Sequence, residues 1–140
     1  MKTYQTFAKQ LLTLLDHDQA VRITVPGFMP LGIEELLPTA EGNRQISLAH
    51  YGDQNGDAMR DPELVFELIE CGDDLLAEPV YFRNDYAAIE QWVYDRGEDG
   101  HTIGFRPRLK RDLRIFARTW LRNLRAQGFF DRDATREVLS

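Results

Sequence analysis

The sequence lacks the features that mark several classes of protein. Its single cysteine, Cys71, excludes a framework of disulfides within the chain. No segment approaches the roughly 20 consecutive apolar residues that a membrane-spanning helix needs. The first residues, MKTYQTFAKQLLTLLDHD, are too polar for a signal peptide. We therefore expect a cytoplasmic protein with no membrane-bound segment.

The composition is typical of a chain that forms a hydrophobic core. Hydrophobic residues make up 43% of the 140 residues, and two Trp, five Tyr and eight Phe supply large apolar side chains. A chain of this length buries roughly two-thirds of the surface that it exposes when unfolded. Six prolines and ten glycines are too few to indicate disorder. These numbers predict one compact domain.

Hydrophobic periodicity predicts a helix near each end of the chain. The first is expected at about residues 3–16, where apolar side chains recur every three or four positions. The second is expected at about residues 107–127, because Pro107 suits the first turn of a helix and Gly128 suits the residue after its end. The apolar stripe of the second helix consists of Leu109, Leu113, Phe116, Ala117, Trp120 and Leu124.

Strand patterns fill the middle of the sequence. We expect strands at about residues 21–37, 45–51, 62–70 and 79–94, separated by segments rich in turn-forming residues. The tail from Asp131 is expected to fray or to form one further turn. No helix separates the strands, so sequence neighbours are expected to pair in antiparallel fashion. The prediction is an α+β fold, a single domain in which an antiparallel β-sheet packs against an N-terminal helix and a long C-terminal helix.

Charge is distributed unevenly along the chain. The net charge is −6. Residues 106–125 hold eight of the seventeen Lys and Arg residues and one acid, Asp112, which leaves nine basic and twenty-two acidic residues elsewhere. The sequence therefore describes an acidic body that carries one basic element.

Five arginines of the basic element share one side of the predicted helix. At about 100° per residue, they lie away from the apolar stripe: Arg111, Arg114, Arg118, Arg122 and Arg125. Guanidinium groups bind phosphates through paired hydrogen bonds and without regard to base sequence. The row therefore indicates a nucleic-acid backbone or an acidic partner. A solvated face, pairing with the acidic body and pairing with a second subunit are the alternatives.

One predicted loop is more polar than a turn requires. Residues 52–57 include two glycines, two aspartates and an asparagine. If Asp53 is the first position of a calcium-loop pattern, Asn55 and Asp57 place oxygen-bearing side chains at the third and fifth positions. The sixth position is Ala58 instead of Gly, and the twelfth is Leu64 instead of Glu. The motif is incomplete, so we favour a turn in which Asp and Asn bind the loop backbone.

The same region supplies the candidate binding residues, which are His50, Tyr51, Gln54, Asn55, Asp57, Arg60 and Asp61. A histidine beside carboxylates is suited to acid–base chemistry or to half of a metal site. A metal-dependent enzyme centred on His50, Asp57 and Asp61 is therefore one alternative function. The sequence offers no matching nucleophile, oxyanion hole or second histidine at ligand spacing. We assign no catalytic residue, no metal site and no cofactor.

Three sequence blocks are similar to a known family: ISLAHYGDQNGDAMRDPELVFEL, EPVYFRNDY and GFRPRLKRDLRIFARTWLRNLRAQGF. In this order they resemble an uncharacterised bacterial domain-of-unknown-function family found in plasmid, phage and other mobile-element genes. The resemblance covers about residues 27–129 and implies a small α+β domain without an assigned activity. The Gly52–Asp53 pair departs from it, because bulkier or acidic residues are expected before the run Gln54–Asp57.

Together these observations favour a non-enzymatic binding or interaction module over an enzyme. The expected partner is another protein, and a nucleic acid bound by the five arginines is the first alternative. The long helix, or an unpaired edge of the sheet, also suits a homodimer. The sequence identifies neither the partner nor the ligand.

Overall fold

A computed structural model describes residues 2–139, which form two helices and nine strands. Their order is α1 (Lys2–Leu15), β1 (Ala20–Thr24), β2 (Leu31–Leu36), β3 (Gln45–Gln54), β4 (Asp57–Cys71), β5 (Asp74–Asn84), β6 (Ile89–Trp92), β7 (Tyr94–Arg96), β8 (Thr102–Phe105), α2 (Pro107–Gln127) and β9 (Thr135–Val138).

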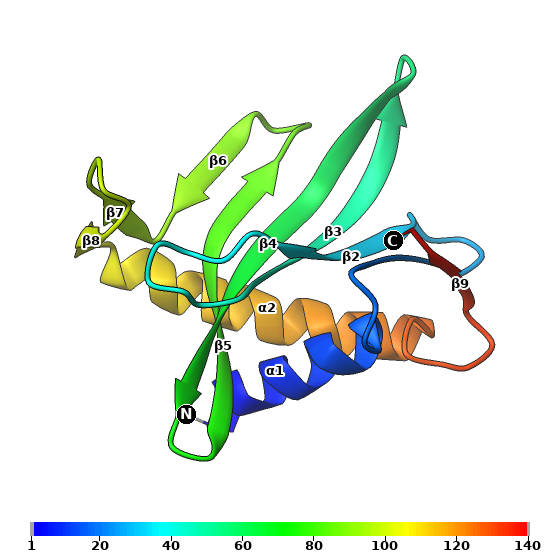
Figure 1. The fold of residues 1–140 in the computed structure, drawn as a ribbon. Coiled ribbons are helices and arrows are strands. Elements are labelled where there is room, and N and C mark those ends of the chain that lie inside the picture. The colour runs from blue at the N-terminus through cyan, green and yellow to red at the C-terminus, as the bar shows by residue number, and fades with distance from the viewer. Residues whose placement is uncertain (1, 140) are drawn as a thin grey trace.

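Seven strands form one antiparallel sheet in the order β6-β5-β4-β3-β2-β1-β9, and β7 pairs with β8 in a separate hairpin. Both helices lie on the same side of the sheet (Figure 1). The predicted α+β fold, a single domain with an antiparallel sheet against an N-terminal and a C-terminal helix, is confirmed.

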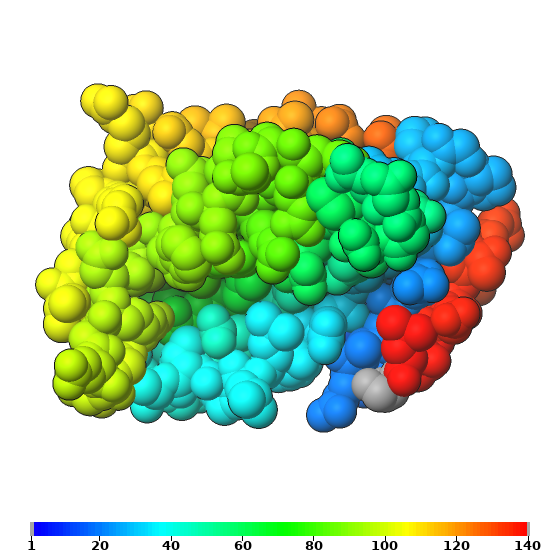
Figure 2. Space-filling view, turned by 90° about the horizontal axis from the view of Figure 1, so that it is seen from above, coloured from blue at the N-terminus to red at the C-terminus, as the bar shows by residue number. Residues whose placement is uncertain are grey.

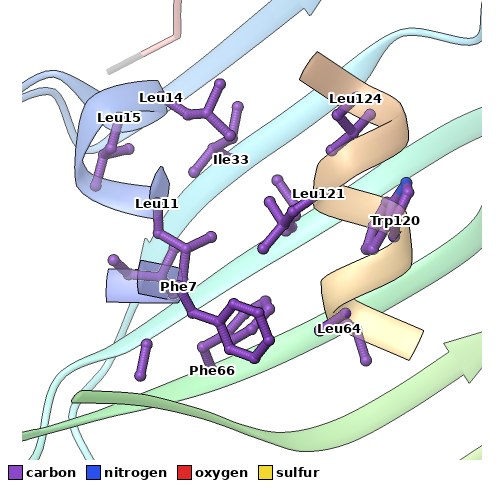
Figure 3. Close-up of a cluster of buried hydrophobic side chains, with 14 of the residues drawn as sticks. Phe7, Leu11, Leu14, Leu15, Ile33, Leu64, Phe66, Trp120, Leu121 and Leu124 are labelled. Atoms are coloured by element: carbon purple, nitrogen blue, oxygen red, sulfur yellow. The ribbon is translucent and has the colours of Figure 1, made fainter. Parts of the chain in front are cut away.

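The core lies between the two helices and the sheet. Figure 3 shows apolar side chains of α1 and α2 directed toward Leu64 and Phe66 of β4. Phe7 meets Phe66 edge-on, with ring centroids 5.9 Å apart. Burying a side chain of this size contributes about 1.5–3 kcal/mol. The apolar stripes of the helices therefore fix which side of each helix faces the sheet.

Phe116 departs from the predicted stripe of α2. It is 36% exposed, whereas Leu121, which the stripe omitted, is buried. Phe116 packs edge-on against Phe82 of β5, with ring centroids 5.6 Å apart. The apolar face of α2 thus extends to Leu121, which belongs to the same buried cluster as the apolar residues of α1.

The connection between β3 and β4 is shorter than predicted, since the predicted strand bounds left ten residues, 52–61, between them. The strands continue to Gln54 and from Asp57, so only Asn55 and Gly56 form the turn. Both have positive φ, 53° and 89°, the combination that a two-residue type I′ turn requires. The hydrophobic alternation stops earlier because this end of the hairpin projects beyond the helices (Figure 1), where neither face needs apolar side chains.

The tail also differs from expectation. Instead of fraying or forming one further turn, residues 135–138 form β9, an edge strand paired with β1. All four residues of β9 are exposed, so the segment carries no buried apolar alternation from which a strand could be inferred. Arg136 anchors it, because its guanidinium donates to the carbonyls of Leu14 (2.6 Å) and Leu15 (2.8 Å) and pairs with Asp18.

No helix or further strand layer of residues 2–139 covers the other face of the sheet. Figure 2 shows it as a hollow between the residues of β2 and the loop after it (cyan) and a raised bank from the β3–β4 hairpin to β6 (green). One part of the hollow, about 330 Å³, is lined by residues that include Tyr81, Trp92 and Tyr94. The structure therefore has two layers, with one helical face and one open sheet face.

Replacing Arg136 by Ala is expected to lower the free energy of unfolding by about 1–3 kcal/mol, because the last carbonyls of α1 lose their charged donor. Arg132→Ala is the matched control, since Arg132 lies in the same tail and is exposed without an ion pair among residues 2–139. Urea denaturation measures both. Equal stability of the two variants would contradict the role given to Arg136.

Candidate functional site

The candidate residues of the β3–β4 hairpin do not converge on one site. His50 lies on the helical side of β3 against Trp120, whereas Tyr51 lies on the open face over Gly32. Successive side chains of a strand point to opposite faces. Gln54, Asn55 and Asp57 are at the solvent-exposed end of the hairpin. The hairpin therefore disperses side chains that are close in sequence.

His50 is a core residue. Its ring lies 5.6 Å from Trp120 and 5.4 Å from Phe129, measured between ring centroids. Nδ1 lies 3.4 Å from the carbonyl oxygen of Pro30, which can only accept, so this nitrogen is the donor. Burial lowers the pKa of His50, and the backbone carbonyls and the charge of Asp61 offset only part of that effect. At neutral pH His50 is an uncharged packing residue.

Arg60 and Asp61 join β4 to the end of β5. The carboxylate of Asp85 accepts the backbone N–H of Arg60 at 2.8 Å, and Asp61 accepts from the amide of Asn84 at 2.7 Å. Burial by itself would raise the pKa of Asp85, but the hydrogen bond from the Arg60 N–H and the Arg83 guanidinium hold it below its usual range. Asp85 was not among the residues proposed from the sequence, because only the pairing of β4 with β5 brings it to Arg60.

Gly52, which departs from the expected family pattern, has a structural explanation. The hydroxyl of Tyr86 lies against it so closely that a Cβ at this position would overlap the ring. A larger residue is therefore excluded unless Tyr86 moves. Asp53 accepts the N–H of Gly56 at 3.0 Å, which is the local turn bond expected of an aspartate in this position.

The residues proposed for a metal-dependent enzyme are not assembled as a metal site. Among residues 2–139, no three His, Cys, Asp or Glu side chains lie close enough together to hold an ion. Asp57 is exposed at the hairpin end while His50 is buried. Neither of the two described helices has the length and apolar character needed to cross a membrane.

Several charged groups on and around the open face are paired with one another. Glu63 accepts the hydroxyl of Ser47 and lies 3.1 Å from the Arg60 guanidinium. Arg96 bridges Glu41 and Glu67. Burial, followed by a hydrogen bond to Glu90, raises the pKa of Tyr81 to about 12. These paired groups have little charge left to attract a ligand, although Arg22 and Glu34 on the same face have no ion pair among residues 2–139.

The helical layer of the molecule is strongly basic. Together α1 and α2 carry nine basic side chains and one carboxylate, which leaves eight basic and twenty-two acidic side chains for the rest of the chain. Because both helices cover the same side of the sheet (Figure 1), the positive charge is collected on one face of the molecule. The sequence alone located only the part of this charge that belongs to α2.

The arginine row of α2 is open to solvent. Arg111, Arg118, Arg122 and Arg125 are exposed, and Arg114 is half-buried. Within the part of the chain that the structure describes, the only carboxylate in ion-pair distance of these five is Asp112, 3.8 Å from Arg111. Arg125 lies over the ring of Phe130, 4.4 Å from its centroid. The acidic body therefore does not neutralise the row.

A groove of about 370 Å³ separates part of this row from α1. Arg118, Arg122 and Arg125 form one wall, and the other is formed by Thr3, Thr6, Phe7 and Gln10. Neither wall contains an acid. The sequence did not indicate that α1 forms one wall of this groove, because the α1 residues that line it are uncharged. One feature of the sequence could have indicated a basic surface there, since α1 has two lysines and no Asp or Glu.

A comparison with known protein families identifies the family of this chain. Residues 2–130 match the family described as a domain of unknown function, DUF6908. The chain belongs to this family. The DUF6908 match includes both helices and β1–β8, whereas β9 lies beyond it. No curated protein and no solved structure matches the chain. Membership of an uncharacterised domain family is thus confirmed.

Replacing His50 by Gln in this DUF6908 protein is expected to flatten the pH dependence of its stability. As the pH falls below the ordinary histidine value of 6.5, the unfolded chain takes up a proton that buried His50 resists, so the free energy of unfolding falls. Urea denaturation between about pH 7.5 and about pH 5.5 measures the slope. The exposed His17, changed to Asn, is the control. A slope unchanged by His50→Gln would contradict the uncharged, buried state given to this histidine.

Proposed function

We propose that this protein is a non-enzymatic binding module that contacts the phosphate backbone of a nucleic acid through the arginine row of α2. The observation that carries the proposal is the exposure of this row without neutralising carboxylates on the rest of the described chain. A row that served only the stability of the fold would be expected to pair with the acidic body.

The side-chain type and the spacing suit phosphate. A guanidinium donates two parallel hydrogen bonds to one phosphate and stays charged at all physiological pH values. From Arg111 to Arg125 the row spans about 21 Å of helix, long enough for several phosphates. Contacts of this kind release counterions, so affinity falls steeply as salt rises.

The net charge of −6 is unevenly distributed over the fold. Part of the negative charge lies at the ends of hairpins, including Asp53 and Asp57 in one and Asp73 and Asp74 in another. Exposed charges farther apart than about 8 Å are largely screened at physiological ionic strength. The basic face can therefore attract a polyanion while the acidic parts orient it.

Fewer observations support the other interpretations. An acidic protein partner would bind to the same arginines. Measuring the binding of poly-glutamate beside that of nucleic acid distinguishes this partner from a nucleic acid. A metal-dependent enzyme at His50, Asp57 and Asp61 has no assembled ligand set among residues 2–139. Homodimer formation, a cytoplasmic location and a bacterial mobile-element origin stay predictions. Light scattering at several concentrations tests the first of these.

Binding of fluorescent DNA and RNA oligonucleotides, measured at two salt concentrations, tests the proposal. Arg118→Gln with Arg122→Gln is expected to weaken binding by roughly tenfold, about 1.4 kcal/mol. The slope of log affinity against log salt should fall by about 1.4 for a single strand, since two phosphate contacts are lost. Circular dichroism checks that the variant is folded.

The matched control is Thr119→Glu with Asn123→Glu. These exposed neighbours lie on another side of α2, about 100° round the helix, and the double change alters the net charge by the same amount. Equal loss in both variants would show only a general charge effect. Absence of salt-sensitive binding, or equally tight binding of poly-glutamate, would overturn the proposal.

A further inference from the structure

We infer that the groove between α1 and α2 holds one strand of a nucleic acid, so that the protein prefers single-stranded chains to duplexes. This inference rests on the function proposed above and specifies its substrate class. It depends on a feature that the arginine row alone does not have, namely a second wall that faces the row across the groove.

The two walls offer complementary donors. Arg118, Arg122 and Arg125 supply charged N–H groups from α2. Thr3 and Gln10 face them from α1 with a hydroxyl and an amide, which bind phosphate or sugar oxygens without adding charge. Lys9 of α1 is exposed beyond that wall. A strand within the groove is therefore contacted from both sides.

A duplex does not fit this arrangement. The major groove of B-DNA is about 12 Å wide and admits one α-helix, which has a diameter of about 10–12 Å. Helix α2 cannot enter alone, because α1 lies alongside the wall that carries its arginines. A duplex resting on the outside reaches the protruding guanidinium groups but not Gln10 or the buried Phe7 at the bottom.

The groove is suited to the backbone more than to the bases. Phe7 is its one aromatic lining residue and is 2% exposed, so it offers no free ring for base stacking. The guanidinium of Arg125 lies over the Phe130 ring, 4.4 Å from its centroid, and a guanidinium plane can stack on any base. Binding is therefore expected to be nearly independent of sequence.

The experiment compares a single strand of about 12 nucleotides with its own duplex, long enough to cover the row. Simple attraction to charge would favour the duplex, which has more phosphates per unit length. The groove predicts the reverse, with the single strand bound about fivefold more tightly or better at equal salt. Fluorescence anisotropy on the complete chain measures both affinities.

The second arm tests the wall formed by α1. Gln10→Glu places a carboxylate in the groove and is expected to weaken single-strand binding about fivefold or more while affecting the duplex less. Gln5→Glu is the matched control. It makes the same chemical change at a position about 140° round the helix from Gln10, on another side of α1. Thermal melting confirms that both variants are folded.

The outcomes separate the two proposals. If neither nucleic acid binds in a salt-sensitive manner, the proposed function itself is wrong. If salt-sensitive binding occurs but the duplex binds as tightly as the single strand, the function stands and the groove inference is overturned. The groove inference is likewise overturned if Gln10→Glu weakens binding no more than Gln5→Glu does.

Discussion

The packing of two apolar helix faces on one side of the sheet determines the rest of this structure. Phe7 and Leu11 from α1 meet Phe66, while Trp120 and Leu124 from α2 complete the same cluster (Figure 3). Once these side chains are buried, the polar residues of both helices must face outward on one surface. The segregation of positive charge is therefore a consequence of core packing, and the arginines need no separate device to hold them there.

The contrast between the two faces supports the choice of working surface. On and around the open sheet face, Glu63 and Arg96 are bound by partners from the same chain. On the helical face, Arg118 and Arg122 have no carboxylate in ion-pair distance among the residues that the structure describes. A charge that is already paired has little left to offer a ligand, whereas the exposed guanidinium groups of Arg118 and Arg122 keep their donors free for one.

The helices were recognisable from sequence because the signals that define them are local. Apolar residues recur with helical period, and Pro107 and Gly128 mark the two ends of α2. The strand signals were weaker wherever a strand was not half-buried. The hairpin end near Asn55 and the tail strand around Arg136 are exposed, so hydrophobic alternation could not extend the first or identify the second.

The sequence by itself determined the fold class, the basic character of α2 and the arginine row, because helical periodicity places every fourth residue on one side. Only the tertiary structure decided that His50 belongs to the core and that Gln10 lines the same groove as Arg122. The reason is physical. Burial and the juxtaposition of two helices depend on contacts between residues far apart in the chain, and no local pattern records which neutral side chains will line the space between them.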